Sequence, residues 1–559
     1  MSAFPPSLLT LVVFVPVAGA LLLIFIPHGE KNQVRAWTLL TMVADLVLAA
    51  IAYGQFDPKG PEFQFQELRP WIPPLGITYH LGVDGLSVSL VLLTGFLGPI
   101  LVLASWKFIQ ERVKEFHLAL LLMQTAMLGS LVSLDLILFY VFFEAMLVPM
   151  YLNIGVWGSE ERLRAAVTFF LYTFVGSLLM LVAILAIYLA QPAGTRSFEY
   201  GAVYNSLVSA HRELAACSGQ SACPGLSSLA LTLKIWGPLM FLAFALAFAI
   251  KVPMFPVHTW LPLAHVEAPV AGSVVLAGVM LKLGTYGFWR FAIPLFPGAA
   301  YQFRPLFVSL AVVGIVYGAL MCLAQHDGKK LIAYSSVSHL GMCMLGIFAL
   351  TAEAATGSAF QMLSHGVSTG ALFTLFGFAY ERRHTRAINA YGGIAKVMPV
   401  FAACFVIIAF SSIAVPGTNG FVGEFLVLLG AFKAPGLWLG FPLLAATTVF
   451  LGAAYLLWMV QKIFFGPIDR PENEGLRDLD LREKLIAGVF VVAVLLMGLQ
   501  PQPLLDRLAP STERFIARAR LGTPDAPKVR DGEIRVEMLP LPGAPSTASA
   551  PATALLTPR

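Results

Sequence analysis

The chain of 559 residues has little charge: only 12% of its residues are Asp, Glu, Lys or Arg, against 58% hydrophobic residues. Soluble domains usually carry about 25% charged residues, so the composition excludes an ordinary soluble protein and indicates a polytopic membrane protein. The net charge of +5 lies in short loops and a tail, which does not indicate nucleic-acid binding. The first residues lack the basic stretch of a secretory signal peptide, so the first apolar run is expected to be the first span.

Cofactor-binding motifs are also missing. The five cysteines form no CxxC and no Cys/His spacing, so neither a zinc site nor an iron–sulfur cluster is expected in this chain. No GxGxxG occurs that would indicate a nucleotide or flavin site. Cys217 and Cys223 share one polar loop, where a disulfide is allowed if the loop faces an oxidising compartment. We therefore expect no cofactor and no metal here, and leave the bridge open.

Long apolar runs predict an all-α protein with about fourteen spans, each near the ~20 residues that a bilayer requires. They cover roughly residues 8–27, 36–54, 84–106, 116–133, 136–156, 165–190, 233–262, 268–292, 305–324, 329–350, 355–380, 398–433, 437–465 and 484–500. The odd-numbered loops hold 18 lysines and arginines against 8 in the even-numbered loops. By the positive-inside rule, the odd loops should be cytoplasmic and both termini periplasmic.

Two of the predicted spans are interrupted. Pro253, Pro256 and Pro262 break the span 233–262, and the stretch PGTNG breaks the span 398–433. Each is the fourth of five consecutive spans, in blocks covering 115–292 and 303–465. Because five is odd, the second block should be inverted relative to the first, which is typical of transporters. An N-terminal three-helix segment (1–110), a last span (466–505) and a polar, largely disordered tail (506–559) complete the predicted organisation.

A few ionisable side chains fall inside the predicted spans: Glu144, Lys251, Lys282, His339, His365 and Glu424. A charge at the bilayer centre costs about 3 kcal/mol on insertion scales, and such residues usually mark ion or proton pathways. Taken in chain order, they suggest a lateral proton wire that joins a half-channel in the first repeat to one in the second.

Glu144 and Lys251 are expected to form a pair. Burial disfavours the charged form of a lysine and a nearby carboxylate favours it, so separating the pair would release a proton and closing it would recapture one. The plainer interpretation is a structural ion pair. Lys282 either extends this path or reaches to the membrane interface with its long side chain.

The histidines admit two interpretations each. Gln361, Ser364, His365 and Ser368 recur at helical spacing and form a polar stripe, which serves either a proton relay or helix packing. The same alternatives hold for His339 in the serine-rich stretch YSSVSH. Glu424 either passes a proton outward or binds freed backbone amides. His258 and His265, beside the first break, either take part or only cap broken backbone.

Four stretches carry a resemblance to a known family: KVPMFPVHTWLPLAHVEAPVAGSVVLAGVMLKLGTYG, DGKKLIAYSSVSHLG, MLSHGVSTGALF and PGTNGFVGEF. They closely resemble the antiporter-like membrane subunits of respiratory complex I, the subunit M (chain 4) branch in particular, over about residues 80–465. The resemblance implies fourteen helices with two inverted five-helix repeats, in one proton-translocating unit of NADH–quinone oxidoreductase, a translocase. By motif, Glu144 and Lys251 match the family's pair, Lys282 its bridging lysine, His339 and His365 its central histidines, and Glu424 its exit residue.

Glu424 separates this branch from its relatives, because the sister subunits L and N usually carry lysine there. The resemblance implies that NADH, FMN, iron–sulfur clusters and quinone belong to partner subunits, with L and N as neighbours in the lipid of a bacterial inner membrane. The loop from Gln191 to Ser228 looks longer than is typical of the family. Two alternatives stay open: a subunit of a multi-subunit cation/proton antiporter, and a membrane subunit of a hydrogenase or formate-oxidising complex.

Overall fold

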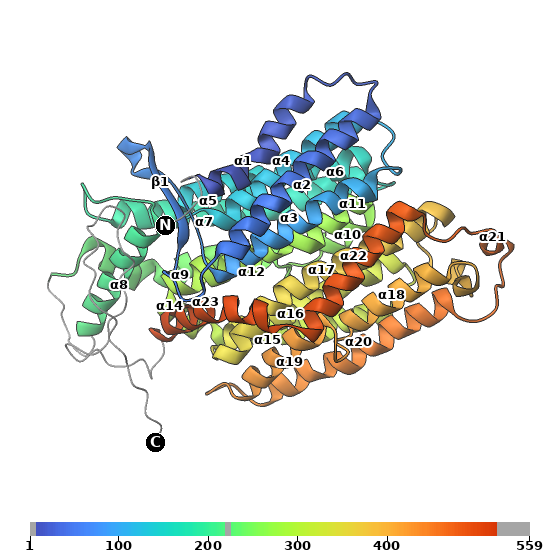
Figure 1. Cartoon of the computed structure of the whole chain (residues 1–559). Helices are drawn as coiled ribbons and strands as arrows, with labels where there is room; N and C mark the ends of the chain where they lie inside the picture. Colours follow the sequence, from blue (N-terminus) through green and yellow to red (C-terminus); the bar gives the residue numbers. More distant parts are fainter. Residues whose placement is uncertain (1–6, 218–224, 523–559) are drawn as a thin grey trace.

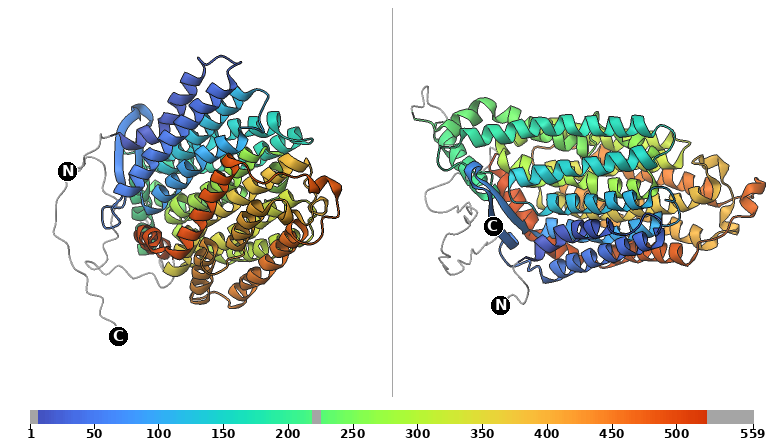
Figure 2. Two further views of the ribbon diagram at one scale, coloured as in Figure 1. Left: turned by 45° about the vertical axis from the view of Figure 1, so that its right-hand side comes forward. Right: turned by 90° about the horizontal axis from the view of Figure 1, so that it is seen from above.

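A computed structural model describes residues 7–217 and 225–522. The helices run side by side in one bundle, seen from its flank in Figure 1 and from two further directions in Figure 2. The first part of the chain forms α1 (Leu8–Leu23), α2 (Lys31–Gln55), β1 (Gln64–Ile72), β2 (Ile77–Val83), α3 (Gly85–Ser105), α4 (Val113–Val132), α5 (Leu136–Ala145), α6 (Leu147–Trp157), α7 (Arg162–Ala190), α8 (Tyr200–Ala216), α9 (Ser228–Lys251) and α10 (Trp260–Glu267).

The second part continues the bundle from one helix that contains two π-helical turns. This helix comprises α11 (Val270–Val275), a π turn (Leu276–Met280), α12 (Leu281–Gly287), a second π turn (Phe288–Ala292) and α13 (Ile293–Leu295). It is followed by α14 (Pro297–Gln302), α15 (Arg304–Leu323), α16 (Gly328–Ala349), α17 (Ala352–Arg383), α18 (Pro399–Ser412), α19 (Asn419–Phe432), α20 (Gly440–Phe464), α21 (Pro471–Glu474), α22 (Leu481–Leu499) and α23 (Gln502–Arg520).

Most of these helices suit a membrane by length and composition. Among the described residues, 11 helices are long and apolar enough to cross one, or 12 if α22 and α23, which meet at 66°, count as one. The apolar helices α1, α18 and α19 are shorter. The chain is therefore the mostly helical, polytopic protein that its composition predicts, and every predicted span coincides with a helix or an interrupted helix.

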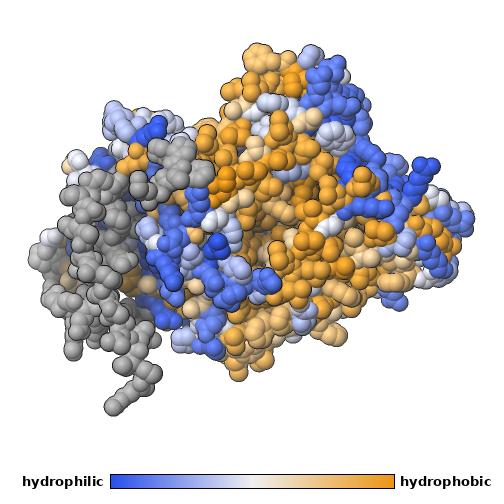
Figure 3. Space-filling model, viewed as in Figure 1, coloured by the Kyte–Doolittle hydropathy of each residue, from blue (hydrophilic) through white to orange (hydrophobic). Residues whose placement is uncertain are grey.

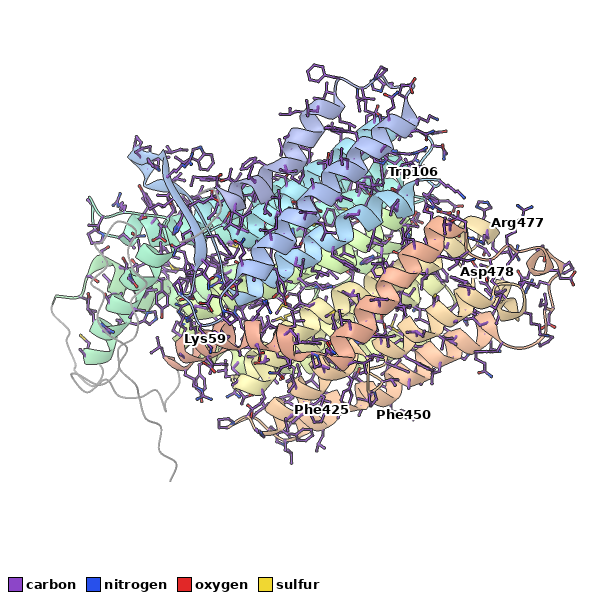
Figure 4. All side chains as sticks on the ribbon, in the orientation of Figure 1. Lys59, Trp106, Phe425, Phe450, Arg477 and Asp478 are labelled. Atoms are coloured by element: carbon purple, nitrogen blue, oxygen red, sulfur yellow. The ribbon has the colours of Figure 1, made fainter. Side chains whose placement is uncertain are left out.

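The surface agrees with this placement. Figure 3 shows a broad apolar flank with hydrophilic residues at both ends of the bundle. Figure 4 places Lys59 at one end, Arg477 and Asp478 at the other, and Phe425 and Phe450 along the flank. The two phenylalanines expose 51% and 76% of their surface, as expected of side chains that face lipid.

Both predicted helix breaks are present. α9 ends at Lys251 and α10 begins at Trp260, whose indole Nε1 donates a 2.9 Å hydrogen bond to the freed carbonyl of Ile250. The second break separates α18 from α19, where the hydroxyl of Ser411 donates to Asn419 Oδ1 at 2.5 Å. A side chain therefore satisfies a freed backbone carbonyl at the first break, which is the condition for broken helices at membrane depth, and a side-chain hydrogen bond links the two helices at the second.

Two segments differ from the all-α prediction. Residues between the second and third spans form the antiparallel hairpin β1–β2, with Gly76 in the turn at a φ of +67° that favours glycine. The long loop after α7 contains the helix α8. The Cys217–Cys223 bridge cannot be placed, since Cys223 lies outside the described residues.

Residues 506–520, assigned from the sequence to a disordered tail, are instead part of α23. Leu508, Thr512, Phe515 and Ala519 recur at helical spacing and are buried against the bundle. An amphipathic helix of this kind is stabilised by tertiary packing and not by its own propensity. Its polar composition therefore led to the wrong prediction of disorder. The rest of the predicted tail, from residue 523, lies outside the described residues.

Candidate functional site

Four of the six predicted residues meet in the middle of the bundle. The ammonium of Lys282 lies 2.7 Å from Nδ1 of His365, and the His365 and His339 ring centroids are 5.7 Å apart. Nδ1 of His339 donates to Glu424 Oε1 at 2.8 Å. All four residues are at most 6% exposed. The sequence therefore identified residues that converge, although they come from four helices: α12, α16, α17 and α19.

The spatial order differs from the chain order. Following the contacts, the residues run Lys282, His365, His339, Glu424, so the two histidines exchange places relative to the predicted wire. Chain order could not reveal this exchange, because α16 and α17 are antiparallel neighbours and either histidine could have faced α12.

The hydrogen bonds assign complementary tautomers to the two histidines. When Lys282 is protonated its ammonium has donors only, so in that state His365 Nδ1 accepts from Lys282 and the neutral ring carries its proton on Nε2. His339 donates from Nδ1 to a carboxylate, so the neutral ring has its lone pair on Nε2. Both Nε2 atoms are buried and have no hydrogen-bond partner. One ring thus offers a proton and the other a vacant acceptor.

A π-helical turn positions Lys282. The turn Leu276–Met280 directly precedes α12, and Ala277 within it accepts a hydrogen bond from the Lys282 ammonium. π-helical turns leave carbonyls without their usual i+4 partner and are frequent at functional sites. The ammonium therefore has one backbone acceptor and one imidazole acceptor in an otherwise buried environment.

Close helix contact brings Lys282 to His365. Gly366 follows His365, and a Cβ built on it would lie 2.8 Å from the carbonyl oxygen of Gly278 and 2.6 Å from a methyl carbon of Leu93. Only glycine allows the two backbones to approach so closely. The glycine pair is thus a precondition for the short contact between lysine and imidazole.

The polar stripe on α17 continues this network. Gln361 Nε2 donates to Glu424 Oε1 at 3.2 Å, and Asn419 at the start of α19 donates to the Ser364 carbonyl at 3.3 Å. The hydroxyl of Ser364 is buried without a partner. The stripe therefore binds the Glu424 carboxylate and the second helix break to α17, contacts for which sequence spacing gave no partner.

Glu144 and Lys251 are close enough to interact electrostatically, but among the described residues they form no ion pair. Lys251 Nζ has no hydrogen-bond partner and lies 4.2 Å from the ring centroid of Phe143. Glu144 is half-buried at the end of α5, with Oε1 lacking a partner. The predicted pair is thus open in this structure. A cation–π contact replaces it, an interaction worth ~2 kcal/mol when desolvated.

Two histidines near the first break behave differently. His258 packs beside Tyr317, with ring centroids 5.1 Å apart, and its Nδ1 is buried without a hydrogen-bond partner. The ring of His265 caps nothing: it is fully buried, stacks on Phe373 at 4.6 Å and leaves both nitrogens without partners.

A large polar cavity opens beside His265. It has a volume of about 940 Å³, and its lining includes Lys329, Arg386 and Asp327. Lys329 donates to the carbonyls of Val266 and Ala268, and Arg386 also donates to Val266. Two cations therefore hold the end of α10 open toward the cavity.

The fold and the site together define a class: polytopic helical membrane proteins in which two broken helices flank a buried row of carboxylate, lysine and histidine side chains. Residues 133–452 match the family described as NADH:quinone oxidoreductase/Mrp antiporter, TM, and residues 69–133 match the amino terminus of NADH-ubiquinone oxidoreductase chain 4. The chain belongs to this family of antiporter-like membrane subunits of complex I.

Individual relatives agree with the match. The chain is 43% identical to NADH-quinone oxidoreductase subunit M of Rhodobacter capsulatus, covering 92% of this chain and 98% of that protein. It is 40% identical to chain 4 of Arabidopsis thaliana, covering 90% and 96%.

Solved structures share the fold. A chain of respiratory complex I from Thermus thermophilus has a TM-score of 0.78 at 35% identity, with coverage of 91% of this chain and 99% of that one. A chain of the Mrp complex from Dietzia has a TM-score of 0.75 at 19% identity, with coverage of 91% and 97%. At that identity the second likeness concerns the fold alone.

Proposed function

We propose that this chain is a proton-translocating membrane subunit of an NADH–quinone oxidoreductase. The buried series from Lys282 through His365 and His339 to Glu424 carries the proposal, because neighbouring buried ionisable groups are what a proton path requires. Its two ends are hydrogen-bonded pairs, and the two rings between them lie 5.7 Å apart. Membership in a family whose relatives are named subunit M supports it. Glu144 and Lys251 would form the input end of the same path.

The complementary histidine tautomers give the path a direction. A proton on His365 Nε2 can pass to the lone pair on His339 Nε2, while His339 releases its Nδ1 proton to Glu424. After this shift Nδ1 of His365 can take a proton from Lys282. This shift leaves Lys282 neutral, Glu424 protonated and both rings in the opposite tautomer. The starting forms return when Glu424 releases its proton outward, Lys282 is recharged and both rings reorient, so one proton advances per cycle.

The open Glu144–Lys251 contact supplies the switch. Without a carboxylate beside it, burial of Lys251 disfavours its charged form, and closing the contact restores that form. The same pair thus releases or captures a proton according to its separation. A signal from the redox partners would act by favouring either the open or the closed form of this contact, which shifts the equilibrium between two conformations.

The wider architecture follows the same proposal. Fourteen crossings arise if α1, the interrupted pair α18–α19 and α22 each cross once in addition to the 11 long helices. The blocks 115–292 and 303–465 would be inverted repeats, with half-channels opening to opposite sides. The basic loops would be cytoplasmic and both termini periplasmic, in a bacterial inner membrane.

The redox chemistry belongs to partners in this proposal. NADH, FMN, iron–sulfur clusters and quinone would bind other subunits of the complex, with subunits of the L and N type as neighbours. This chain would convert their signal into proton movement, so the translocase activity is a property of the complex. The alternative, a cation/proton antiporter subunit, is supported by the similarity to a chain of the Mrp complex. At 19% identity that similarity concerns the fold alone.

The proposal is tested by Lys251→Ala in inverted membrane vesicles, with NADH-driven proton pumping, quinone reduction and the amount of assembled complex measured together. We expect normal assembly with both activities strongly reduced. Lys234→Ala is the matched control, since Lys234 lies on the same helix but is exposed and should leave both activities unchanged. Normal pumping in an assembled Lys251→Ala complex would show that the lysine is structural and that the path is wrong.

A further inference from the structure

An apolar groove lies between α2, α3, α17 and the turn that joins α22 to α23, helices that are drawn together near the middle of Figure 1. Its walls include Leu46, Phe96, Leu363, Ala493 and Leu504, and its volume is about 490 Å³. This lies within the ~300–1,000 Å³ of typical ligand sites. The walls are almost wholly aliphatic or aromatic, so the part of an occupant that fills them must be apolar.

One end of the groove is polar. Tyr53 and Gln500 line it there, and the guanidinium of Arg507 lies 4.4 Å from the Tyr53 ring centroid. Arg507 donates to the carbonyls of Tyr53 and Pro503. Within the described ranges it has no carboxylate partner, and the neighbouring Asp506 accepts from Gln502 at 2.6 Å. A positive charge without a counter-ion therefore sits at the mouth of an apolar groove.

This mouth lies at the level of the helix ends. α2 ends at Gln55, α22 ends at Leu499, and α23 departs from α22 at 66°. Tyrosine and arginine gather at the membrane–water interface, where one end of the side chain is apolar and the other hydrated. The groove thus begins at the interface and continues among the spans.

We propose that the groove binds one phospholipid, with an acyl chain along the apolar walls and the phosphate against Arg507. The lining is almost wholly apolar except at the mouth, which matches a molecule with one long apolar chain and one charged end. Charge complementarity favours an anionic head over a neutral one.

The bound chain would protect the site described above. Leu363 and Val367 line the groove and flank His365 on α17, and Leu93, another lining residue, contacts the position of Gly366. Occupation therefore keeps water away from the helix that carries the central histidine. This consequence rests on the proposed function, whereas lipid binding does not.

The test is photo-crosslinking of the assembled complex in native membranes. The probes are a phosphatidylglycerol with a photoreactive acyl chain and a matched diacylglycerol that lacks the phosphate, and labelled peptides are identified by mass spectrometry. We expect phosphatidylglycerol to label peptides of α3, α17 and α22. Arg507→Gln should lower this labelling about fivefold, which corresponds to the ~1 kcal/mol of one arginine near an anionic head, without changing labelling by diacylglycerol.

Two variants on α22 separate the groove from the general lipid surface. Ala493→Trp places a large ring in the groove and should reduce labelling of α3 and α17 at least fivefold. Val492→Trp, at the adjacent residue that is 63% exposed, should leave it unchanged. Arg514→Gln, seven residues beyond Arg507 on α23, is the control for charge and should also leave it unchanged.

Two outcomes would overturn the proposal. These are no groove labelling in the unaltered complex, and equal labelling in Ala493→Trp and Val492→Trp. The first result would show that no lipid enters the groove, and the second would assign the labelling to the general lipid surface. Because labelling is read without any pumping, a failed Lys251→Ala test would leave this result standing.

Discussion

Gly366→Ala is expected to uncouple the central path by forcing two helices apart. The new Cβ would lie 2.8 Å from the carbonyl oxygen of Gly278, where ordinary contact begins at 3.4 Å. Because that oxygen belongs to backbone, α17 must move by about 0.6 Å, the difference between the two distances. The bond from Lys282 to His365, now 2.7 Å long, would stretch to about 3.3 Å, beyond the usual limit of ~3.2 Å.

The magnitude follows from two terms. Overpacking a close contact costs about 1–3 kcal/mol of stability, so some loss of assembled complex is expected. A hydrogen bond to a charged group contributes about 1.5–3 kcal/mol, and 1.36 kcal/mol corresponds to a tenfold change in rate. We therefore expect proton pumping per assembled complex to fall about tenfold or more.

The assay compares Gly366→Ala with Gly370→Ala in inverted vesicles, with pumping normalised to assembled complex. Gly370 lies one turn further along α17, and a Cβ there meets its nearest atoms only at 3.6 Å or beyond. It should assemble and pump normally. Equal pumping by the two variants would refute the reasoning, because it would show that the Lys282–His365 contact does not depend on this close approach.

Three further predictions concern the ends of the path and its framework. Glu424→Gln removes the charged acceptor of His339 while keeping its size, so NADH-driven pumping in vesicles should fall about tenfold with normal assembly; unchanged pumping would argue against an exit role. Lys329→Met leaves buried carbonyls at the end of α10 unsatisfied, which costs about 1–3 kcal/mol, so assembled complex on native gels should decrease, whereas the exposed neighbour Lys330→Met should have no effect. Arg518→Ala removes the bidentate partner of the nearly buried Glu62 carboxylate and leaves it Arg290 at 3.9 Å. Breaking a buried pair costs up to about 3–5 kcal/mol, so the melting temperature of the complex should drop, and an unchanged value would show that α23 is not held by this pair.

Much of the candidate site could be predicted because membrane insertion makes each charge conspicuous. Lys282 and Glu424 stand alone in apolar runs and His365 lies in a polar stripe of an apolar helix, and a group that costs several kcal/mol to bury is retained only where something requires it. Their contacts could not be predicted in the same way. The exchange of His339 and His365 depends on which faces of α16 and α17 turn toward α12, and the open state of Lys251 depends on the position of the Phe143 ring.

The polar segments show the opposite limit. The hairpin β1–β2 and the helices α8 and α23 lie outside the long apolar runs, so hydropathy carried no signal for them. α23 is polar on average, so its sequence alone did not predict a helix there. The structure shows that Leu508 and Phe515 are buried on one face of this helix.

By itself the sequence determined the class of protein, the place of its long apolar helices, the two breaks and the ionisable residues inside the apolar runs. These features depend on local physics, because hydrocarbon excludes unsatisfied backbone groups and isolated charges. The apolar length, the prolines and the ionisable residues of each segment therefore predict its structure without knowledge of the other segments. Only the tertiary structure decided which ionisable groups touch, in what order, and with which tautomers. Those contacts are set by close approach between helices distant in the chain, as at Gly278 and Gly366, and by rings and hydroxyls that fill the space left between them.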